Sequence, residues 1–391
     1  MVGAWVASVD EGAGGEFGGQ GGEVVRGDVK IDGGGLGHGG IIMWCEFGVT
    51  RNKKKLKVIK LKVKRDFWLT LRGLLAPAPS QTAGFELGII LYMNTTHTRI
   101  GIIGGSGLGN ALVAAGGAES VEVGTPFGEA SAPIMLGEWG GVPVAFLARH
   151  GVGHTILPSG VNYRANIWAL KAVGCRWILA SGAVGSLREE IAPRDLVVVD
   201  QVIDKTVRRV GTFFEEVGAA VHVEFAEPFC GKLRGILQSA ADGLPAIKVH
   251  SAGTYVCMEG PAFSSRAESL MHRGWGGDLI GMTAMPEAKL AREAEISYAL
   301  IALATDYDCW RPHVHKPGET RQTLLAEILG HMHHATENAL ALIKAAVPLV
   351  WERRAEDFEA HRALELAIWT EKSRIAAEQK ERFGLLWSKY M

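Results

Sequence analysis

The sequence contains no run of about 18 uncharged apolar residues, so it offers no segment that would span a membrane as a helix. It has little cysteine, and its 5 cysteines are scattered and never spaced C-x-x-C, which speaks against a disulfide framework and a zinc site. Charge of neither sign prevails, because 41 Lys and Arg residues face 42 Asp and Glu residues. We therefore expect a cytoplasmic protein with reduced thiols and no general attraction to nucleic acid or anionic membranes.

The first segment, residues 1–92, is rich in glycine and then in basic residues. Glycine occupies 15 of the first 40 positions, and 9 of the 15 residues at 51–65 are Lys or Arg. Such a glycine-rich sequence buries too little apolar surface to offset the entropy lost on ordering it. We expect a disordered leader, or a segment that does not belong to the native protein, which would then start at Met93. The basic run could otherwise serve as a nucleic-acid or membrane tether.

The middle segment, residues 93–348, alternates short β-branched runs with amphipathic stretches of helical period. This alternation predicts an α/β fold, a single large domain with a mixed, mainly parallel central sheet flanked by helices. The runs that we expect to form strands lie at 99–104, 142–148, 177–182, 195–200, 278–283 and 298–305.

The last segment, residues 349–391, is dominated by Ala, Glu, Lys and Arg. Leu364, Ile368 and Ile375 lie at helical spacing, and from 351 onward there is no proline. We expect a helical C-terminal extension that docks on the core or packs against another subunit.

A glycine-rich turn follows the first predicted strand of the middle segment. A dinucleotide fingerprint needs glycines at positions i, i+2 and i+5, and here Gly105 and Gly107 are followed by Asn110. The Gly-Lys-Ser/Thr of an ATP-binding loop is also missing from this region. The turn suits a small anion, which converging backbone N–H groups and the Ser106 hydroxyl could hold, unless it serves packing alone.

Three further predicted strands end in groups that could bind an anion. Arg149 and His150 follow the strand at 142–148, a second glycine turn lies at 181–189, and Thr283 ends the strand at 278–283. Open α/β sheets bind ligands at the carboxyl ends of their strands, and an arginine fork matches phosphate oxygens. These strand ends together predict one shared anion site.

Two acidic residues, Asp306 and Asp308, follow the predicted strand at 298–305. Side chains at i and i+2 of an extended chain point the same way, and two neighbouring carboxylates repel, so one tends to keep its proton. A protonated carboxyl can donate to a ring nitrogen while its ionised neighbour accepts from an amine, which matches N7 and N6 of adenine. A magnesium site or a helix-capping pair are the alternatives.

The stretches "IGIIGGSGL", "LARHG", "GSLREEI", "AEPFC", "FSSRAES", "MTAMPEAKLAREA" and "ATDYDCW" occur in this order between residues 99 and 345. Together they resemble 5′-methylthioadenosine phosphorylase, of the trimeric purine nucleoside phosphorylase superfamily. The resemblance implies phosphorolysis of 5′-methylthioadenosine to adenine and 5-methylthioribose 1-phosphate, a step of methionine and purine salvage. It also implies a homotrimer that needs no cofactor, because inorganic phosphate is a co-substrate, and no metal.

The same resemblance assigns roles to individual residues. Asp306 and Asp308 fall on the adenine-reading, catalytic positions, and His222 falls on a position that reaches a neighbouring subunit's nucleoside site. The phosphate-binding positions fall on Ser106, Arg149, His150, Gly182, Ala183 and Thr283. The substrate-binding positions fall on His154, His222, Phe263, Ser264, Met282, Asp306, Tyr307 and Asp308.

The sequence departs from the family pattern at three places. Gly182 stands where some relatives carry threonine, Ala262 stands where the family usually has arginine, and the stretch 311–322 follows no family pattern. That stretch belongs to the 5′ side of the nucleoside site in relatives. The sequence therefore predicts the preference for adenine more firmly than the choice between a methylthio group and a hydroxyl.

The sequence leaves other functions open. Among enzymes, the alternative is a purine nucleoside phosphorylase that acts on adenosine, or on inosine or guanosine. The alternatives that are not enzymes are an inactive nucleoside-binding protein and a nucleic-acid-binding protein acting through residues 51–65. Two histidine clusters could suggest a metal, but no carboxylate or cysteine completes a ligand set, so we expect them to be solvated or structural. They comprise His313, His315, His331, His333 and His334.

Overall fold

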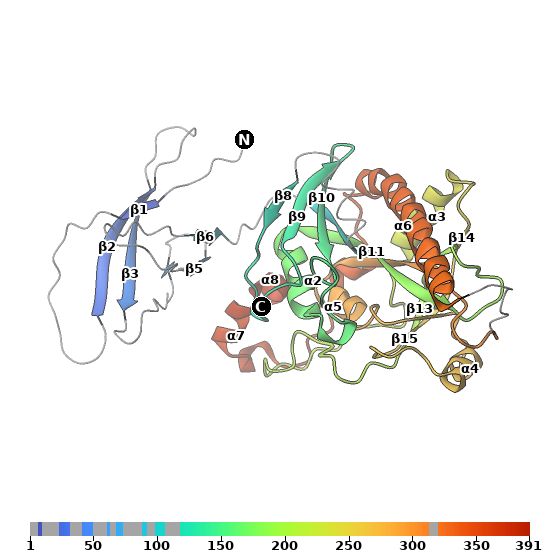
Figure 1. Cartoon of the computed structure of the whole chain (residues 1–391). Coiled ribbons are helices and arrows are strands. Elements are labelled where there is room, and N and C mark those ends of the chain that lie inside the picture. Colours follow the sequence, from blue (N-terminus) through green and yellow to red (C-terminus); the bar gives the residue numbers. More distant parts are fainter. Residues whose placement is uncertain are drawn as a thin grey trace. The chain divides into compact units, whose positions relative to one another are not determined.

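The computed structural model describes residues 98–105, 118–312 and 320–391, together with six strands between residues 7 and 91 (Figure 1). The chain forms two compact units, Met1–Met93 and Asn94–Met391. In the first unit the strands form two three-stranded antiparallel sheets, β1–β3 and β4–β6, and the other residues up to 97 lie outside the described part. The nature of residues 1–92 therefore stays a prediction. The strands are β1 (Ala7–Val9), β2 (Glu23–Ile31), β3 (Ile41–Val49), β4 (Leu61–Lys62), β5 (Trp68–Arg72) and β6 (Gly88–Leu91).

The second unit is built on one mixed sheet of 11 strands, in which β11 lies between β7, β16 and β17. Its long central pairs, β7 with β10 and β11 with both β7 and β17, are parallel, whereas β8, β9 and β10 form an antiparallel edge. The predicted fold class is confirmed. The strands are β7 (Arg99–Gly104), β8 (Glu119–Val121), β9 (Ile134–Trp139), β10 (Val142–Ala148), β11 (Cys175–Ser186), β12 (Leu196–Val198), β13 (Gln201–Asp204), β14 (Val249–His250), β15 (Thr254–Cys257), β16 (Leu279–Gly281) and β17 (Ser297–Asp306).

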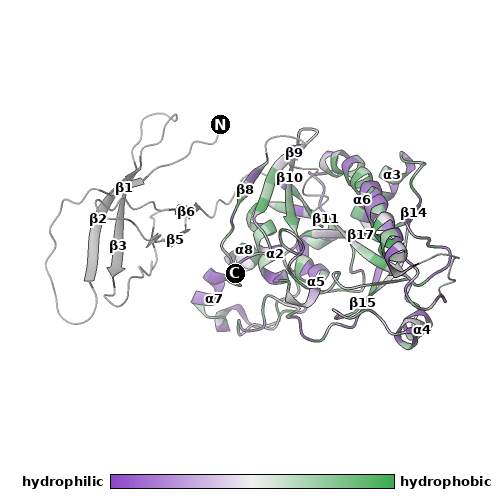
Figure 2. Ribbon diagram, in the orientation of Figure 1, coloured by the Kyte–Doolittle hydropathy of each residue, from purple (hydrophilic) through white to green (hydrophobic). Residues whose placement is uncertain are grey.

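Helices cover both faces of this sheet (Figures 1 and 2). Side chains of α2 and α5 share one buried cluster, and those of α3 and α6 share the other. Successive residues of a strand point to opposite faces, so Leu300 and Ala302 of β17 join the first cluster while Ile301 and Leu303 join the second. The helices are α2 (Tyr163–Ala172), α3 (Gly231–Asp242), α4 (Arg266–Gly274), α5 (Glu287–Glu293) and α6 (Arg321–Glu352). In the described part of the chain, no helix is long and apolar enough to cross a membrane.

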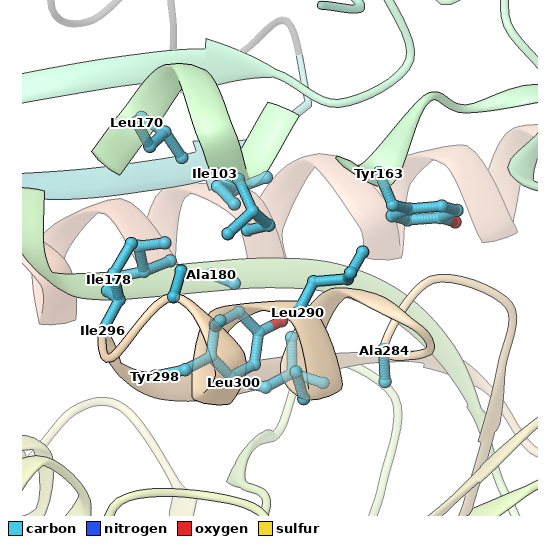
Figure 3. Packing of buried hydrophobic residues seen from close by; sticks show 14 of the residues in the cluster. Ile103, Tyr163, Leu170, Ile178, Ala180, Ala284, Leu290, Ile296, Tyr298 and Leu300 are labelled. Carbon is cyan, nitrogen blue, oxygen red and sulfur yellow. The ribbon is translucent and has the colours of Figure 1, made fainter. Parts of the chain in front are cut away.

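The first cluster positions the start of α5 against the sheet. Figure 3 shows Leu290 of α5 beside Tyr298 and Leu300 of β17, with Ile178 and Ala180 of β11 close by. All five side chains are almost completely buried. Close packing of this kind leaves little freedom to the elements that it joins, which matters because the ends of these same elements carry the candidate site.

The C-terminal extension does not form one helix, although its apolar spacing suggested that. After α6 the chain makes only short helical turns, and Ile368 instead pairs with Val221 in an isolated antiparallel bridge. Leu364 and Ile375 are buried in the first cluster, so their spacing reflects packing of the extension against the core. The turns are η2 (Glu359–Arg362), η3 (Lys372–Arg374), α7 (Ala377–Arg382), α8 (Gly384–Trp387) and η4 (Ser388–Tyr390).

Two kinds of contact hold this extension. Trp387 is fully buried and its ring stacks on Phe214 at 5.0 Å between centroids. Glu295, just after α5, accepts hydrogen bonds from the Leu364 backbone at 3.1 Å and from the Tyr390 hydroxyl at 2.5 Å. The extension is thus part of the packed core of its own chain.

We predict that Trp387→Ala lowers the free energy of unfolding by about 3–5 kcal/mol, because it opens a cavity in the core. Glu378 lies exposed in the same extension, and Glu378→Ala should change stability by less than about 1 kcal/mol. Urea unfolding of both variants measures the difference. Equal losses in the two variants would contradict the docking of the extension.

Candidate active site

A buried ion pair marks the point where four elements of the second unit meet. Arg149 follows β10, and its Nε and Nη2 donate to the two carboxylate oxygens of Glu287 at 2.7 and 2.8 Å. Its Nη1 donates to the carbonyl oxygen of Ser181 on β11 at 2.8 Å. The Tyr298 hydroxyl of β17 donates to Glu287 at 2.7 Å. One guanidinium therefore connects β10, β11, β17 and the first residue of α5.

Arg149 keeps its charge in this environment. Its side chain is only 2% exposed, and burial alone would lower its pKa, but the charge and hydrogen bonds of Glu287 outweigh burial and raise the pKa above its ordinary value. A guanidinium has five N–H donors, of which Glu287 and Ser181 take three. One hydrogen on each of Nη1 and Nη2 remains for a further acceptor.

Gly182 and Thr283 lie directly beside this guanidinium. A β-carbon at Gly182 would lie 3.1 Å from Thr283 Oγ1 and 3.9 Å from Arg149 Nη1. The hydroxyl and the guanidinium thus converge on the backbone of β11, where Ala183 is the next, exposed residue. The structure brings these four predicted phosphate-binding residues together. Side-chain donors around an open backbone suit a tetrahedral oxyanion.

His150 is the fifth of these residues. Its Nδ1 lies 2.9 Å from the carbonyl oxygen of Ile156, which fixes Nδ1 as the protonated nitrogen and leaves Nε2 as an acceptor. Burial, and then the charge of Arg149, lowers the pKa of His150 to about 4, so the ring is neutral near pH 7. The exposed His154 stacks on it with 4.3 Å between ring centroids. This neutral ring can accept from a protonated phosphate oxygen or a ribose hydroxyl.

The acidic pair at the end of β17 forms a tight local turn. Asp306 Oδ1 accepts from the Asp308 backbone N–H and Oδ2 accepts from the Thr305 hydroxyl, both at 2.7 Å. Asp308 accepts a short hydrogen bond from the Ser269 hydroxyl of α4. Burial and then the nearby charge of Asp306 raise the pKa of Asp308. The sequence predicted that one carboxyl of the pair would keep its proton more readily, and the raised pKa of Asp308 has that direction.

The acidic pair and the anion-binding side chains lie beside one strand, β11. A β-carbon at Gly185 of β11 would lie 3.1 Å from Asp308 Cβ and 3.2 Å from Asp306 Oδ1. Gly182, beside Arg149 and Thr283, lies three residues earlier on the same strand. The strand thus sets the spacing between a site for an anion and a site for a hydrogen-bonding ring.

The predicted ribose and base contacts lie around this strand as well. Gly260, with a φ of 70°, packs so closely on Met282 that a β-carbon there would be 2.6 Å from the methionine sulfur. The Ser264 carbonyl oxygen accepts from the Cys309 thiol at 3.1 Å, which holds this loop next to Asp308. Phe263 is 85% exposed, so its ring is free to cover a ligand.

Two other predicted residues make contacts elsewhere. The Tyr307 hydroxyl donates to the Glu189 carbonyl oxygen at 3.3 Å, so its side chain is engaged with the loop after β11. His222 is exposed, its ring lies 4.8 Å from that of Trp369, and its backbone N–H donates to Ala367 at 2.9 Å. Within the described part of its own chain, the contacts recorded for His222 are with the C-terminal extension.

Some predictions fall on positions that the structure does not describe or does not support as ligands. Ser106 lies outside the described residues, although Gly104 before it accepts from the Arg149 backbone N–H at 3.2 Å. His313 and His315 also lie outside. No group of three or more metal-ligating side chains occurs among the residues described, and His333 and His334 face Glu337 on the exposed side of α6.

Sequence reasoning missed two residues that organise the site. Glu287 lies inside the stretch "MTAMPEAKLAREA", four positions after Thr283, where an acidic first helical residue reads as an ordinary helix start. Arg209 lies in "VRRVG", and nothing in that spacing distinguishes it from the exposed arginines of the chain. Only the buried contacts of both residues reveal their roles.

We predict that two buried histidines lower the stability of the folded chain as the pH drops from about 6.5 to about 4, since the unfolded chain takes up protons at histidine near pH 6.5. In the folded chain the pKa of His150, and also of His361, is lowered to about 4 by burial, so protons favour the unfolded state in this range. Substituting Gln for both residues should flatten the profile of unfolding midpoint against pH. Replacing the exposed His334 should leave it unchanged, and an unaltered slope in the double variant would refute the assignment.

Comparison with known proteins gives a consistent result. A sequence model described as the phosphorylase superfamily matches residues 99–348. The S-methyl-5′-thioadenosine phosphorylase of Thermosynechococcus vestitus is 48% identical over 295 residues, which is 75% of this chain and 99% of the relative. The enzyme of that name from Danio rerio is 46% identical over 261 residues, 66% of this chain and 90% of the relative.

Solved structures agree with these relatives. A methylthioadenosine phosphorylase from an Antarctic soil metagenomic library is 46% identical, covers 75% of this chain with 100% of its own, and has a TM-score of 0.68. A double mutant of the adenosine/methylthioadenosine phosphorylase of Schistosoma mansoni in complex with adenine is 37% identical, covers 70% of this chain with 100% of its own, and has a TM-score of 0.62. The chain belongs to the phosphorylase superfamily and, within it, to the family of the S-methyl-5′-thioadenosine phosphorylases.

Proposed function

We propose that the protein catalyses the phosphorolysis of 5′-methylthioadenosine to adenine and 5-methylthioribose 1-phosphate. The observation that carries this proposal is that both parts of the candidate site lie along one strand, β11. Its Gly182 adjoins Thr283 and the buried Arg149, and its Gly185 adjoins the carboxyl of Asp306 and the β-carbon of Asp308. An anion and a purine bound at these two points would lie on either side of a sugar. The names of the relatives support the same reaction.

In the proposed mechanism the bond between C1′ and N9 stretches first and leaves positive charge on the sugar ring. Phosphate, held by Arg149, Thr283 and the backbone at Gly182 and Ala183, forms the new bond through one oxygen to C1′. The electron pair of the broken bond goes to adenine. Positioning and electrostatic stabilisation supply the acceleration, and neither a covalent enzyme intermediate nor a cofactor is required.

The acidic pair receives the leaving adenine. One carboxyl donates a proton or a strong hydrogen bond to N7, and the other accepts from the 6-amino group. We assign the N7 role to Asp306, as in the family pattern, and the raised pKa of Asp308 gives that neighbour some capacity to carry a proton as well. A 6-oxopurine would present an oxygen where this arrangement offers an acceptor, which disfavours inosine and guanosine.

We further propose that the protein acts as a homotrimer in the cytoplasm, with His222 of one subunit near the nucleoside of the next. Support comes from the surface around His222, where Trp369 is 71% and Leu366 is 88% exposed. Exposed large apolar side chains beside a residue with an expected role in a neighbouring site suit a contact between subunits.

A panel of nucleosides tests the function. With phosphate present, we expect rapid release of adenine from 5′-methylthioadenosine, slower release from adenosine, and no base release from inosine or guanosine. Omitting phosphate should abolish the release of adenine. Equal turnover of inosine would favour a general purine nucleoside phosphorylase, and no turnover at all would favour an inactive nucleoside-binding protein.

We predict that Asp306→Asn lowers kcat by roughly 10²–10⁴, the usual contribution of a positioned proton donor, while the KM for phosphate changes by less than about threefold. Asp242→Asn at the exposed end of α3 is the matched control and should retain full activity. Asp308→Asn should be assayed in parallel. If Asp306→Asn keeps kcat within about threefold while Asp308→Asn loses it, Asp308 is the acid.

A further inference from the structure

Arg209 is a second buried arginine of the site, and the proposed reaction assigns it no role. It lies in the segment after β13, and its side chain is 2% exposed. Its guanidinium faces a set of acceptors that are mostly backbone carbonyl oxygens. They are Met282 O and Met285 O at 2.6 Å, Glu259 O at 2.8 Å, Glu259 Oε1 at 3.0 Å, Tyr163 Oη at 3.2 Å and Met258 O at 3.4 Å.

The two shortest of these bonds bracket the turn that carries Thr283. Nη1 of Arg209 binds the carbonyl oxygens of Met282 and Met285, so Thr283 lies between two fixed points. Glu287, the partner of Arg149, begins α5 two residues after Met285. The same bonds keep both carbonyl oxygens pointing toward Arg209. If either oxygen turned toward the anion site instead, its partial negative charge would repel phosphate.

The other side of the guanidinium holds the neighbouring loop. Nε binds the Glu259 carboxylate and Nη2 binds the Glu259 carbonyl oxygen. The second carboxylate oxygen accepts from the backbone N–H groups of Val207 at 2.7 Å and Arg208 at 3.1 Å. Gly260, which follows Glu259, packs against Met282. Arg209 therefore joins the loop above Met282 to the turn that contains it.

We propose that Arg209 is a positioning residue that fixes the Met282–Met285 turn, so that the Thr283 hydroxyl faces phosphate and Met282 faces the ribose. This inference rests on the proposed function. A planar fork is required, because the ammonium of lysine cannot bond to carbonyl oxygens on two loops at these fixed directions. Asp306 and Asp308, which we propose to bind adenine, are not contacted by Arg209 in the described structure, so adenine binding should depend on Arg209 far less than phosphate binding does.

The test compares Arg209→Lys, which keeps the charge, and Arg209→Met, which removes it, with the unmodified protein. We expect both variants to raise the KM for phosphate by at least about tenfold, since small displacements of positioning groups have large kinetic effects. The inhibition constant of free adenine should stay within about twofold of its normal value. A loss of general folding would instead change both constants.

Arg234→Lys is the matched control, because Arg234 of α3 donates to the Ser251 carbonyl oxygen at 3.0 Å from the other helix layer of the sheet. It should leave the phosphate KM unchanged. If Arg209→Met fails to fold, Arg209→Lys carries the test. A phosphate KM within about twofold of normal in Arg209→Lys, or a parallel rise in the adenine constant, would overturn the inference.

A second measurement separates this inference from the proposed reaction. Phosphate that binds the folded protein raises its unfolding temperature. We expect 20 mM phosphate, roughly a saturating amount for such a site, to raise the Tm of the unmodified protein and of Arg234→Lys by more than that of Arg209→Lys, because tenfold weaker binding removes up to about 1.4 kcal/mol of the stabilisation. An equal rise in all three proteins overturns the role of Arg209 even if no nucleoside is cleaved. If no adenine is released but phosphate changes the Tm values as expected, only the proposed reaction is refuted.

Discussion

The buried pair of Arg149 and Glu287 is the contact on which the site depends. It links a residue just after a strand to the first residue of a helix, and Tyr298 and Ser181 add hydrogen bonds from two further strands. Removing one partner of such a pair leaves an uncompensated charge in the core, typically at a cost of about 3–5 kcal/mol. Neither residue can therefore be changed alone without disturbing the ends of several elements.

The sheet places this ion pair near the acidic pair of Asp306 and Asp308, so the candidate site has two parts. Because β11 pairs in parallel with both β7 and β17, and β7 with β10, Arg149 and the acidic pair lie where strands end. Gly182 and Gly185 lie within β11, which continues to Ser186, and not in the turn that the sequence predicted at 181–189. Glycine at 182 and 185 keeps the backbone of β11 accessible where side chains from β16, β17 and the segment after β10 converge. A larger residue at Gly185 would meet Ile280 at 3.0 Å as well as the side chains of Asp306 and Asp308, so this position tolerates no side chain without movement of its neighbours.

Sequence alone predicted much of this arrangement, because strand ends carry local signals. Arg149 and the Asp306–Asp308 pair each follow an apolar run, and the rule that parallel strands end at one edge brings them together. Thr283 also follows an apolar run, but β16 pairs antiparallel with β11, so this rule does not account for its position. Glu287 and Arg209 escaped prediction because their roles depend on partners 138 and 73 residues away in the chain, and no local spacing encodes such distances. The sequence predicts a helical C-terminal extension that docks on the core or on another subunit. The extension does pack on the core, but through short helical segments, so the spacing of Leu364, Ile368 and Ile375 reflects this packing and not one continuous helix.

The neutral ring of His150 has a consequence for how the anion is selected. Glu287 cancels the charge of Arg149, and His150 adds none near pH 7, so these three side chains together carry no net charge. In the proposed function, recognition of phosphate would depend on the geometry of short hydrogen bonds, which dissolved salt screens far less than long-range attraction. The dianion's charge is left largely uncompensated by these residues, which keeps it available to the electron-poor carbon of the sugar. Tetrahedral anions of similar size, such as arsenate, fit the same donors, and ionic strength should matter little to the choice among them.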